Sequence, residues 1–132
     1  MKLAVLGAGA WGTAISISLA TRHEVTLWAR DRATADAMRA SRVNLRYLPD
    51  FPIPAKVEIT AQFADAVAGC DLLLVATTTA GLRTALRQIA ASGSRAPVIW
   101  LCKGFESDSA QLPHEIAEAE LQKTTLRGAL SG

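Results

Sequence analysis

An α/β fold, with a doubly wound and mostly parallel sheet covered by helices on both faces, is predicted by three features of the sequence. Short β-like runs alternate with longer runs of helical periodicity along the chain. The run DLLLVA at 71–76 is apolar after its first residue, which is typical of a parallel strand buried on both faces. The glycine-rich stretch LGAGAWGTA at 6–14 lies where the first strand would turn into the first helix.

Six strands are expected. The first ends at the glycine-rich stretch, and the second has the sequence EVTLWA. Runs of this length, rich in Val, Ile, Leu and Trp and bounded by polar residues, glycine or proline, favour strands over helices. The expected strands are 1–6, 24–29, 57–60, 71–76, 96–101 and, with the weakest pattern, 125–130.

Four helices are expected between these strands. The clearest has apolar residues at positions i, i+3, i+4 and i+7 from Leu82, which form one stripe on a helix. Arg83 and Arg87 lie off that stripe and are interpreted as a solvated face rather than a site. Residues 42–55 contain three prolines and are expected to form a loop. The expected helices are 10–22, 32–40, 80–91 and 112–121.

The composition predicts one ordinary globular domain over residues 1–132. Half of the residues are apolar, a fifth are charged, and the net charge is +2, so charge alone suggests no nucleic-acid partner. The only two cysteines, Cys70 and Cys102, lie in apolar surroundings, and we expect reduced, buried thiols of a cytoplasmic protein. No cluster of Cys and His suggests a metal site.

The charge-free run 3–20 could be mistaken for a signal peptide or a membrane span. Three glycines within six residues would disrupt a continuous helix there. A buried strand followed by a buried helix explains the same apolarity, so we expect a soluble, untargeted protein with no membrane insertion.

Gly7, Gly9 and Gly12 follow the spacing G-x-G-x-x-G between a strand and a helix. In dinucleotide-binding domains the first glycine permits the tight turn, the second lets the backbone approach the pyrophosphate, and the third lets the helix pack on the sheet. The alternative is a tight turn that binds no ligand. Successive helical residues are rotated by about 100°. If Gly12 faces the sheet, Trp11 therefore points away and borders the mouth of the pocket, unless it is a core aromatic that covers the end of the sheet.

Two cationic residues follow predicted strands at the carboxyl edge, where open α/β sheets bind ligands. Arg30 lies near the position, about 20 residues beyond the loop, where NAD-binding domains carry an acid for the ribose. A guanidinium there suits the 2′-phosphate of NADP, although Asp31 leaves NAD possible and a solvated arginine is the alternative. Lys103 could contact a phosphate, hydroxyl or carbonyl oxygen of a substrate, or be a solvated loop lysine. His23 and His114 lie away from this edge and are assigned no role.

Several stretches together resemble the family of bacterial NAD(P)-dependent glycerol-3-phosphate dehydrogenases: GAGAWGTA, HEVTLWAR, RVNLRYLPD, CKGFE and the final LSG. They occur in the family's order and cover essentially the whole chain. CKG after a strand and N-x-x-YLP upstream are more specific than the glycine loop. The resemblance implies a Rossmann-type NAD(P)-binding domain. It also implies an oxidoreductase that reduces dihydroxyacetone phosphate to sn-glycerol 3-phosphate with NADPH or NADH for phospholipid synthesis.

By this resemblance Ala10, Trp11 and Arg30 contact the cofactor together with the three glycines. Lys103 touches both the nicotinamide nucleotide and the substrate, and Gly132 begins a turn that contacts the substrate. Arg30 favours NADPH. Three departures from the family pattern occur. Residues 76–79 (ATTT) replace Val-Pro-Ser, which puts a cofactor contact from that segment in doubt. Arg22 replaces a glycine, and Phe105 replaces a leucine.

Family members continue past LSG into a helical domain that carries the proton-donating lysine. We therefore expect residues 1–132 to bind the cofactor without turning over substrate alone, with no certain catalytic residue in the chain and an oligomer possible. Two alternatives stay open: the cofactor domain of a related hydroxyacid or ketopantoate-type dehydrogenase, and a dinucleotide-binding module without chemistry.

Overall fold

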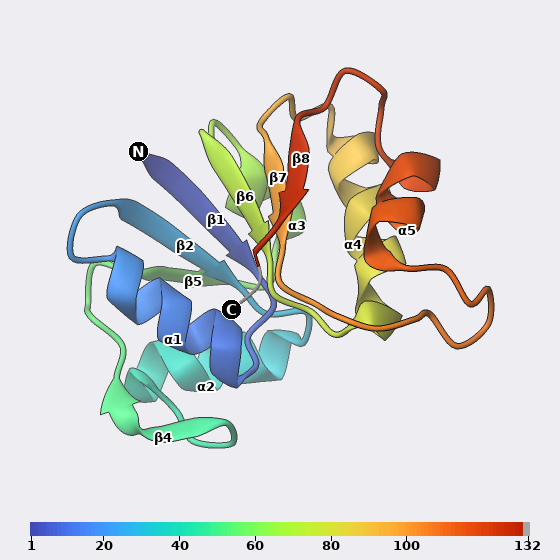
Figure 1. Ribbon diagram of the computed structural model, residues 1–132. Helices are drawn as coiled ribbons and strands as arrows, with labels where there is room; N and C mark the ends of the chain where they lie inside the picture. The colour runs from blue at the N-terminus through green and yellow to red at the C-terminus, as the bar shows by residue number, and fades with distance from the viewer. Residues whose placement is uncertain (131–132) are drawn as a thin grey trace.

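The computed structural model describes residues 1–130 and contains a six-stranded sheet with helices on both sides (Figure 1). The order of strands across the sheet is β5-β2-β1-β6-β7-β8, and every neighbouring pair is parallel. The strands are β1 (Lys2–Leu6), β2 (Glu24–Trp28), β5 (Glu58–Thr60), β6 (Leu72–Val75), β7 (Val98–Trp100) and β8 (Arg127–Ala129).

This order is that of a doubly wound, Rossmann-type domain, so the predicted fold class is confirmed. The chain starts in the middle of the sheet at β1, winds outward through β2 to β5, and then returns to β6 on the other side of β1. All six predicted strands are present, the last one as β8. The point between β1 and β6 where the winding reverses is where such sheets bind ligands, beyond the carboxyl ends of the strands.

Five helices cover the two faces of the sheet and enclose two apolar cores within residues 1–130. Side chains of β1 alternate between them: Val5 packs into one core, Ala4 and Leu6 into the other. The Val5 side is covered by α1 and α2, and the opposite side by α3, α4 and α5. The helices are α1 (Ala10–Leu19), α2 (Arg32–Ser41), α3 (Phe63–Val67), α4 (Thr79–Ser92) and α5 (Pro113–Glu120).

The expectation of an irregular loop at 42–55 is wrong, because this segment forms an antiparallel hairpin of β3 (Val43–Asn44) and β4 (Leu48–Pro52). Two prolines are tolerated in β4 because that strand has a single partner and needs no ladder hydrogen bond on its outer side. The short helix α3 was also not predicted. Its five residues are too few for a periodic pattern.

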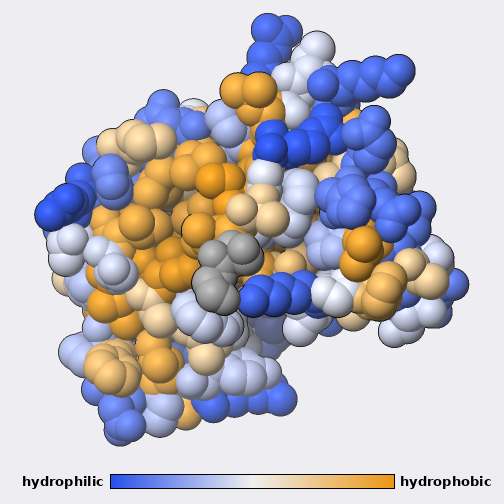
Figure 2. Space-filling view, viewed as in Figure 1, coloured by the Kyte–Doolittle hydropathy of each residue, from blue (hydrophilic) through white to orange (hydrophobic). Residues whose placement is uncertain are grey.

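Helix α1 has no charged residue and is only partly covered by the rest of the described chain. Ile15, Ile17 and Leu19 are half-buried, and Trp11 is exposed. Figure 2 shows hydrophobic atoms gathered over this part of the molecule. Within residues 1–130, no helix combines the length and apolarity that crossing a membrane requires.

Both cysteines are free thiols, and each is partly rather than fully buried. Burial raises the pKa of the Cys70 and Cys102 thiols above the usual value. Both groups are therefore protonated and poorly reactive at neutral pH.

Candidate functional site

A cleft of about 520 Å³ lies at the carboxyl edge of the sheet, where the winding reverses. Its walls come from the turns after β1, β2 and β6, from one side of α4, and from the tip of the β3–β4 hairpin. The residues that line it are Gly7, Ala8, Gly9, Ala10, Trp28, Ala29, Arg30, Asp31, Thr34, Arg46, Tyr47, Ala76, Thr77, Thr78, Ala80, Gly81, Thr84, Ala85 and Gln88.

The three glycines of the first turn occupy different environments. Gly7 has a φ of +121°, and a Cβ there would lie 2.7 Å from the carbonyl oxygen of Ala76. At Gly12 a Cβ would lie 1.9 Å from the carbonyl oxygen of Gly7, so only glycine lets α1 pack this close to the turn. At Gly9, in contrast, a Cβ would have no atom of residues 1–130 within 4 Å apart from its chain neighbours, which leaves the backbone open on that side.

Helix α1 begins in this cleft without a side-chain cap from any described residue. Gly9 is its N-cap residue, and the N–H groups of a first helical turn lack intrahelical acceptors. The positive end of the helix dipole therefore faces the cleft. Trp11 is 75% exposed, so the prediction that it points away from the sheet is confirmed and the core-aromatic alternative is wrong. It is not one of the residues that line the cleft, so its predicted place at the mouth of the pocket stays a prediction. Its contact with a cofactor stays a prediction.

The end of β2 presents one cation and one carboxylate to the cleft, and one oxygen of the carboxylate caps the next helix. Oδ2 of Asp31 accepts hydrogen bonds from the backbone N–H of Thr34 at 3.2 Å and from its hydroxyl at 2.7 Å. These bonds cap α2 and lower the pKa of Asp31. Arg30 is exposed and lines the cleft, as its predicted role requires.

The hairpin carries functional candidates that sequence reasoning missed. Asn44 is buried, and its side-chain amide donates to the Ala8 carbonyl at 2.9 Å and to the Thr13 hydroxyl at 2.8 Å. Its Oδ1 accepts the backbone N–H of Tyr47 at 3.2 Å. These bonds fasten the hairpin to the glycine turn and bring Arg46 and Tyr47 to the cleft. The N-x-x-YLP stretch was the available signal, but its spacing alone does not reveal these partners.

The segment after β6 lines the cleft although it departs from the family's Val-Pro-Ser. Thr77 and Thr78 both contribute to the wall. The Thr77 hydroxyl is buried and has no hydrogen-bond partner among residues 1–130. The departure therefore does not remove this segment from the site.

Lys103 follows β7 at the same edge of the sheet as the cleft, as predicted, although it is not one of the lining residues. The residue is exposed, and its backbone carbonyl accepts a 2.6 Å hydrogen bond from the Thr79 hydroxyl at the start of α4. Gly132, the other predicted substrate contact, lies outside the described residues.

The interpretation of Arg83 as a solvated residue is wrong. Its guanidinium forms ion pairs with Glu106 at 2.9 Å and Glu120 at 3.1 Å, and its side chain is 20% exposed. The hydrogen bonds from Arg83 lower the pKa of Glu106 to about 2. Arg87 is 65% exposed, as expected for a solvated face, and pairs with the other oxygen of Glu120.

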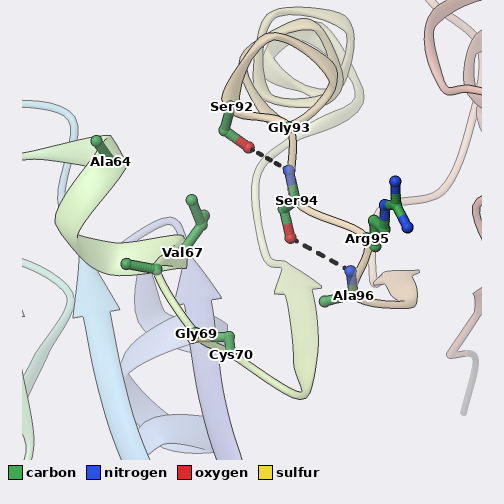
Figure 3. Close-up of a pocket in the computed structure, with 10 residues that line it drawn as sticks. Ala64, Val67, Gly69, Cys70, Ser92, Gly93, Ser94, Arg95 and Ala96 are labelled. Carbon is green, nitrogen blue, oxygen red and sulfur yellow. Dashed lines mark hydrogen bonds between the residues drawn. The ribbon is translucent and has the colours of Figure 1, made fainter.

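A second cavity, shown in Figure 3, lies at the opposite, amino edge of the sheet between α3 and the end of α4. Among the described residues that line it, only Arg95 is charged. Two hydrogen bonds, from Ser94 N–H to the Ser92 hydroxyl and from Ala96 N–H to the Ser94 hydroxyl, close the turn that borders it. The amino edge is not where such sheets bind ligands. The described part of the chain also contains no group of His, Cys, Asp and Glu able to hold a metal ion.

Comparison with known proteins agrees with this geometry. A glycerol-3-phosphate dehydrogenase [NAD(P)+] of Dechloromonas aromatica is 48% identical over 132 residues, which are all of this chain and 40% of the relative. A glycerol-3-phosphate dehydrogenase [NAD(P)+] of Nitrosospira multiformis is 49% identical over 136 residues, and this chain covers 41% of its length. The crystal structure of glycerol-3-phosphate dehydrogenase from Coxiella burnetii superposes with a TM-score of 0.89 at 28% identity, over 99% of this chain and 40% of that one.

The chain thus spans about 40% of the length of the relatives that it matches. A family model described as the N-terminus of NAD-dependent glycerol-3-phosphate dehydrogenase matches residues 2–132. The match covers both the glycine turn and the segment that carries Lys103. The chain therefore belongs to the family of N-terminal domains of NAD-dependent glycerol-3-phosphate dehydrogenases.

Proposed function

We propose that this chain is the cofactor-binding part of an enzyme that reduces dihydroxyacetone phosphate to sn-glycerol 3-phosphate with NAD(P)H, a reaction that supplies glycerophospholipid synthesis. The observation that carries the proposal is the glycine-walled cleft at the reversal point of the sheet, in a chain of this family. Because the chain spans about 40% of its relatives, the activity is proposed for the longer protein.

The cleft fits a dinucleotide. At Gly7 and Gly12 a Cβ would collide with backbone, whereas Gly9 leaves open space against which a pyrophosphate can lie. The uncapped first turn of α1, including Ala10 and Trp11, supplies N–H groups for its oxygens. When bound, the nicotinamide supplies the hydride. The chain's own groups bind and orient the nucleotide against the carboxyl edge of the sheet.

We propose a preference for NADPH. Arg30 and Arg46 both line the cleft, and their guanidinium groups suit a phosphate dianion. Asp31, at the position of an acid that binds the ribose hydroxyls of NAD, uses one of its two carboxylate oxygens, Oδ2, to cap α2. The cleft is thus lined by two cations that suit a 2′-phosphate and, among the described residues, by one carboxylate, which has one oxygen engaged in the cap.

Lys103 is proposed to contact both the nicotinamide nucleotide and the substrate, and Gly132 to contact the substrate. A lysine at this edge supplies a cation for the phosphate or carbonyl oxygen of the triose. Neither histidine is placed with it, since His23 lies at the opposite edge beside the N-terminus and His114 lies on α5. From the family resemblance, the proton donor is proposed to lie outside this chain, in a part of the protein that would also cover the apolar surface of α1.

The cofactor preference is tested by Arg30→Asp, with Arg32→Asp as a control next to the cleft but outside its lining. One charge-assisted hydrogen bond contributes about 1.5–3 kcal/mol, or roughly 10- to 100-fold in affinity. Calorimetry should find that Arg30→Asp lowers the affinity for NADPH by that factor and the affinity for NADH by much less. Arg32→Asp should change neither affinity. An equal loss for both nucleotides would contradict the assignment.

The activity is tested on the full-length protein. Oxidation of NADPH should follow the addition of dihydroxyacetone phosphate and not that of ketopantoate or a 2-oxoacid. Turnover of one of the latter compounds would identify a related dehydrogenase. Tight nucleotide binding without turnover of any of them would identify a module without chemistry.

A further inference from the structure

Lys103 lies in a segment, 101–112, that contains neither helix nor strand and needs other contacts to fix its shape. The segment folds back on itself through two backbone hydrogen bonds of 2.8 Å. In one, Glu106 N–H donates to the Gln111 carbonyl, and in the other Ala110 N–H donates to the Glu106 carbonyl. These bonds define a local loop, but they do not connect Lys103 to the cleft.

Helix α4 makes that connection at two points. Thr79 donates its hydroxyl hydrogen to the Lys103 carbonyl at 2.6 Å. Arg83 binds Glu106 with two parallel hydrogen bonds, from Nε to Oε2 at 3.0 Å and from Nη2 to Oε1 at 2.9 Å. Residues four apart in a helix lie on the same face. Successive turns of α4 therefore hold the two ends of the four-residue stretch 103–106.

The Arg83–Glu106 pair has the features of an ion pair that fixes geometry. The two side chains are 20% and 13% exposed, and a bidentate guanidinium–carboxylate contact sets both distance and orientation. Glu106 accepts a further bond from the Ser109 hydroxyl, and Arg83 also binds Gln111 and Glu120. Arg87, one turn further along, pairs with the α5 residue Glu120 and is 65% exposed.

The same helix also forms a wall of the cleft, through Ala80, Gly81, Thr84 and Gln88. One face of α4 thus borders the proposed nucleotide site while another holds the Lys103 segment. A change in how the segment docks on α4 alters the position of Lys103 relative to the nucleotide without changing the contacts that the cleft-lining residues make with the nucleotide.

We propose that Arg83 and Glu106 are positioning residues. Together with Thr79 they hold Lys103 at a fixed position relative to the cleft. The inference rests on the proposed function for what Lys103 touches. It assigns no chemistry to Arg83 or Glu106 themselves. Both act only through the placement of the lysine.

A double-mutant cycle in the full-length enzyme tests this. Arg83→Met should lower kcat/KM for dihydroxyacetone phosphate at least 10-fold and leave the Kd of NADPH within about twofold, because small misplacements of a reacting group cost large factors. Arg87→Met, the matched control, should change neither. Lys103→Ala alone should lower kcat/KM strongly. Adding Arg83→Met to Lys103→Ala should lower kcat/KM by less than a further twofold.

Glu106→Gln removes the charge of the loop partner in the same ion pair and should reproduce the loss of kcat/KM. The test therefore does not depend on the folding of a single variant. Hydrogen exchange gives a readout independent of activity: the Glu106 and Ala110 amides should exchange at least 10-fold faster in Arg83→Met and at the wild-type rate in Arg87→Met. Additive losses with Lys103→Ala, equal effects of the two arginine variants, or unchanged exchange would overturn the inference. An inactive wild-type enzyme with faster loop exchange in Arg83→Met would instead refute the proposed function.

Discussion

Gly9 and Gly12 are only three residues apart, yet alanine should affect the protein differently at the two positions. At Gly12 the new Cβ would lie 1.9 Å from the Gly7 carbonyl oxygen, whereas ordinary van der Waals contact begins at 3.4 Å. The turn and α1 must therefore separate by about 1.5 Å. Overpacking costs about 1–3 kcal/mol, and a shift of this size also misplaces the backbone N–H groups of the turn. Gly12→Ala should lose both stability and nucleotide affinity.

Gly9→Ala should lose affinity alone. Its φ of −79° is allowed for alanine, and apart from the chain neighbours no atom of residues 1–130 lies within 4 Å of the new Cβ. Alanine is a poorer N-cap than glycine, which lowers stability, but it also reduces the entropy of the unfolded chain, which raises stability. Because these effects oppose each other, the free energy of unfolding should change by less than about 1 kcal/mol. The methyl group, however, occupies the side from which a pyrophosphate would approach. Loss of one charge-assisted hydrogen bond, about 1.5–3 kcal/mol, should lower the affinity for NADPH roughly 10- to 100-fold.

Urea unfolding followed by circular dichroism gives the free energy of unfolding, and calorimetry gives the Kd for NADPH. Wild-type affinity of Gly9→Ala for NADPH, or wild-type stability of Gly12→Ala, would contradict the roles given to these two glycines. Loss of stability in Gly9→Ala comparable to that in Gly12→Ala would also contradict the contrast between open and filled space at the two positions.

Two further predictions concern residues outside the glycine turn. Asn44→Ala leaves a carbonyl and a hydroxyl without their buried donor and should lower the free energy of unfolding by about 1–3 kcal/mol, measured by urea unfolding, and weaken NADPH binding. The pKa of Glu106 is about 2 in the folded protein against an ordinary 4.5, so its contribution to stability is present above pH 4.5 and disappears as the pH falls through 2. Glu106→Gln should flatten the loss of unfolding free energy over this range, whereas Glu118→Gln, whose side chain is 77% exposed, should not. An unchanged acid profile in Glu106→Gln would show that the ion pair does not contribute.

The alternation of strands and helices could be predicted from the sequence because each element's signal is local. The apolar run of β6 and the stripe that begins at Leu82 depend only on residues within one element. The glycine spacing and Arg30 likewise identified one wall of the cleft, because the position of each relative to its strand follows from short counts along the chain.

The remaining features depend on partners far apart in sequence. Asn44 fastens the hairpin through Ala8, 36 residues earlier, and no periodicity in 42–55 indicates that contact. Arg83 lies off the apolar stripe as a solvated residue would, but its carboxylate partner is 23 residues away in a segment without regular structure. Only the packing of α4 against that segment shows that the arginine is engaged.

Residues 1–132 are proposed to bind the nucleotide, whereas the reaction is proposed to require the longer protein. The most direct measurement titrates the purified polypeptide of residues 1–132 with NADPH by fluorescence, adds dihydroxyacetone phosphate, and follows NADPH oxidation beside the full-length protein. We predict saturable NADPH binding by both proteins and turnover by the full-length protein alone. Turnover by the 132-residue polypeptide at the full-length rate would contradict this division of roles, and absence of NADPH binding would contradict the assignment of the cleft.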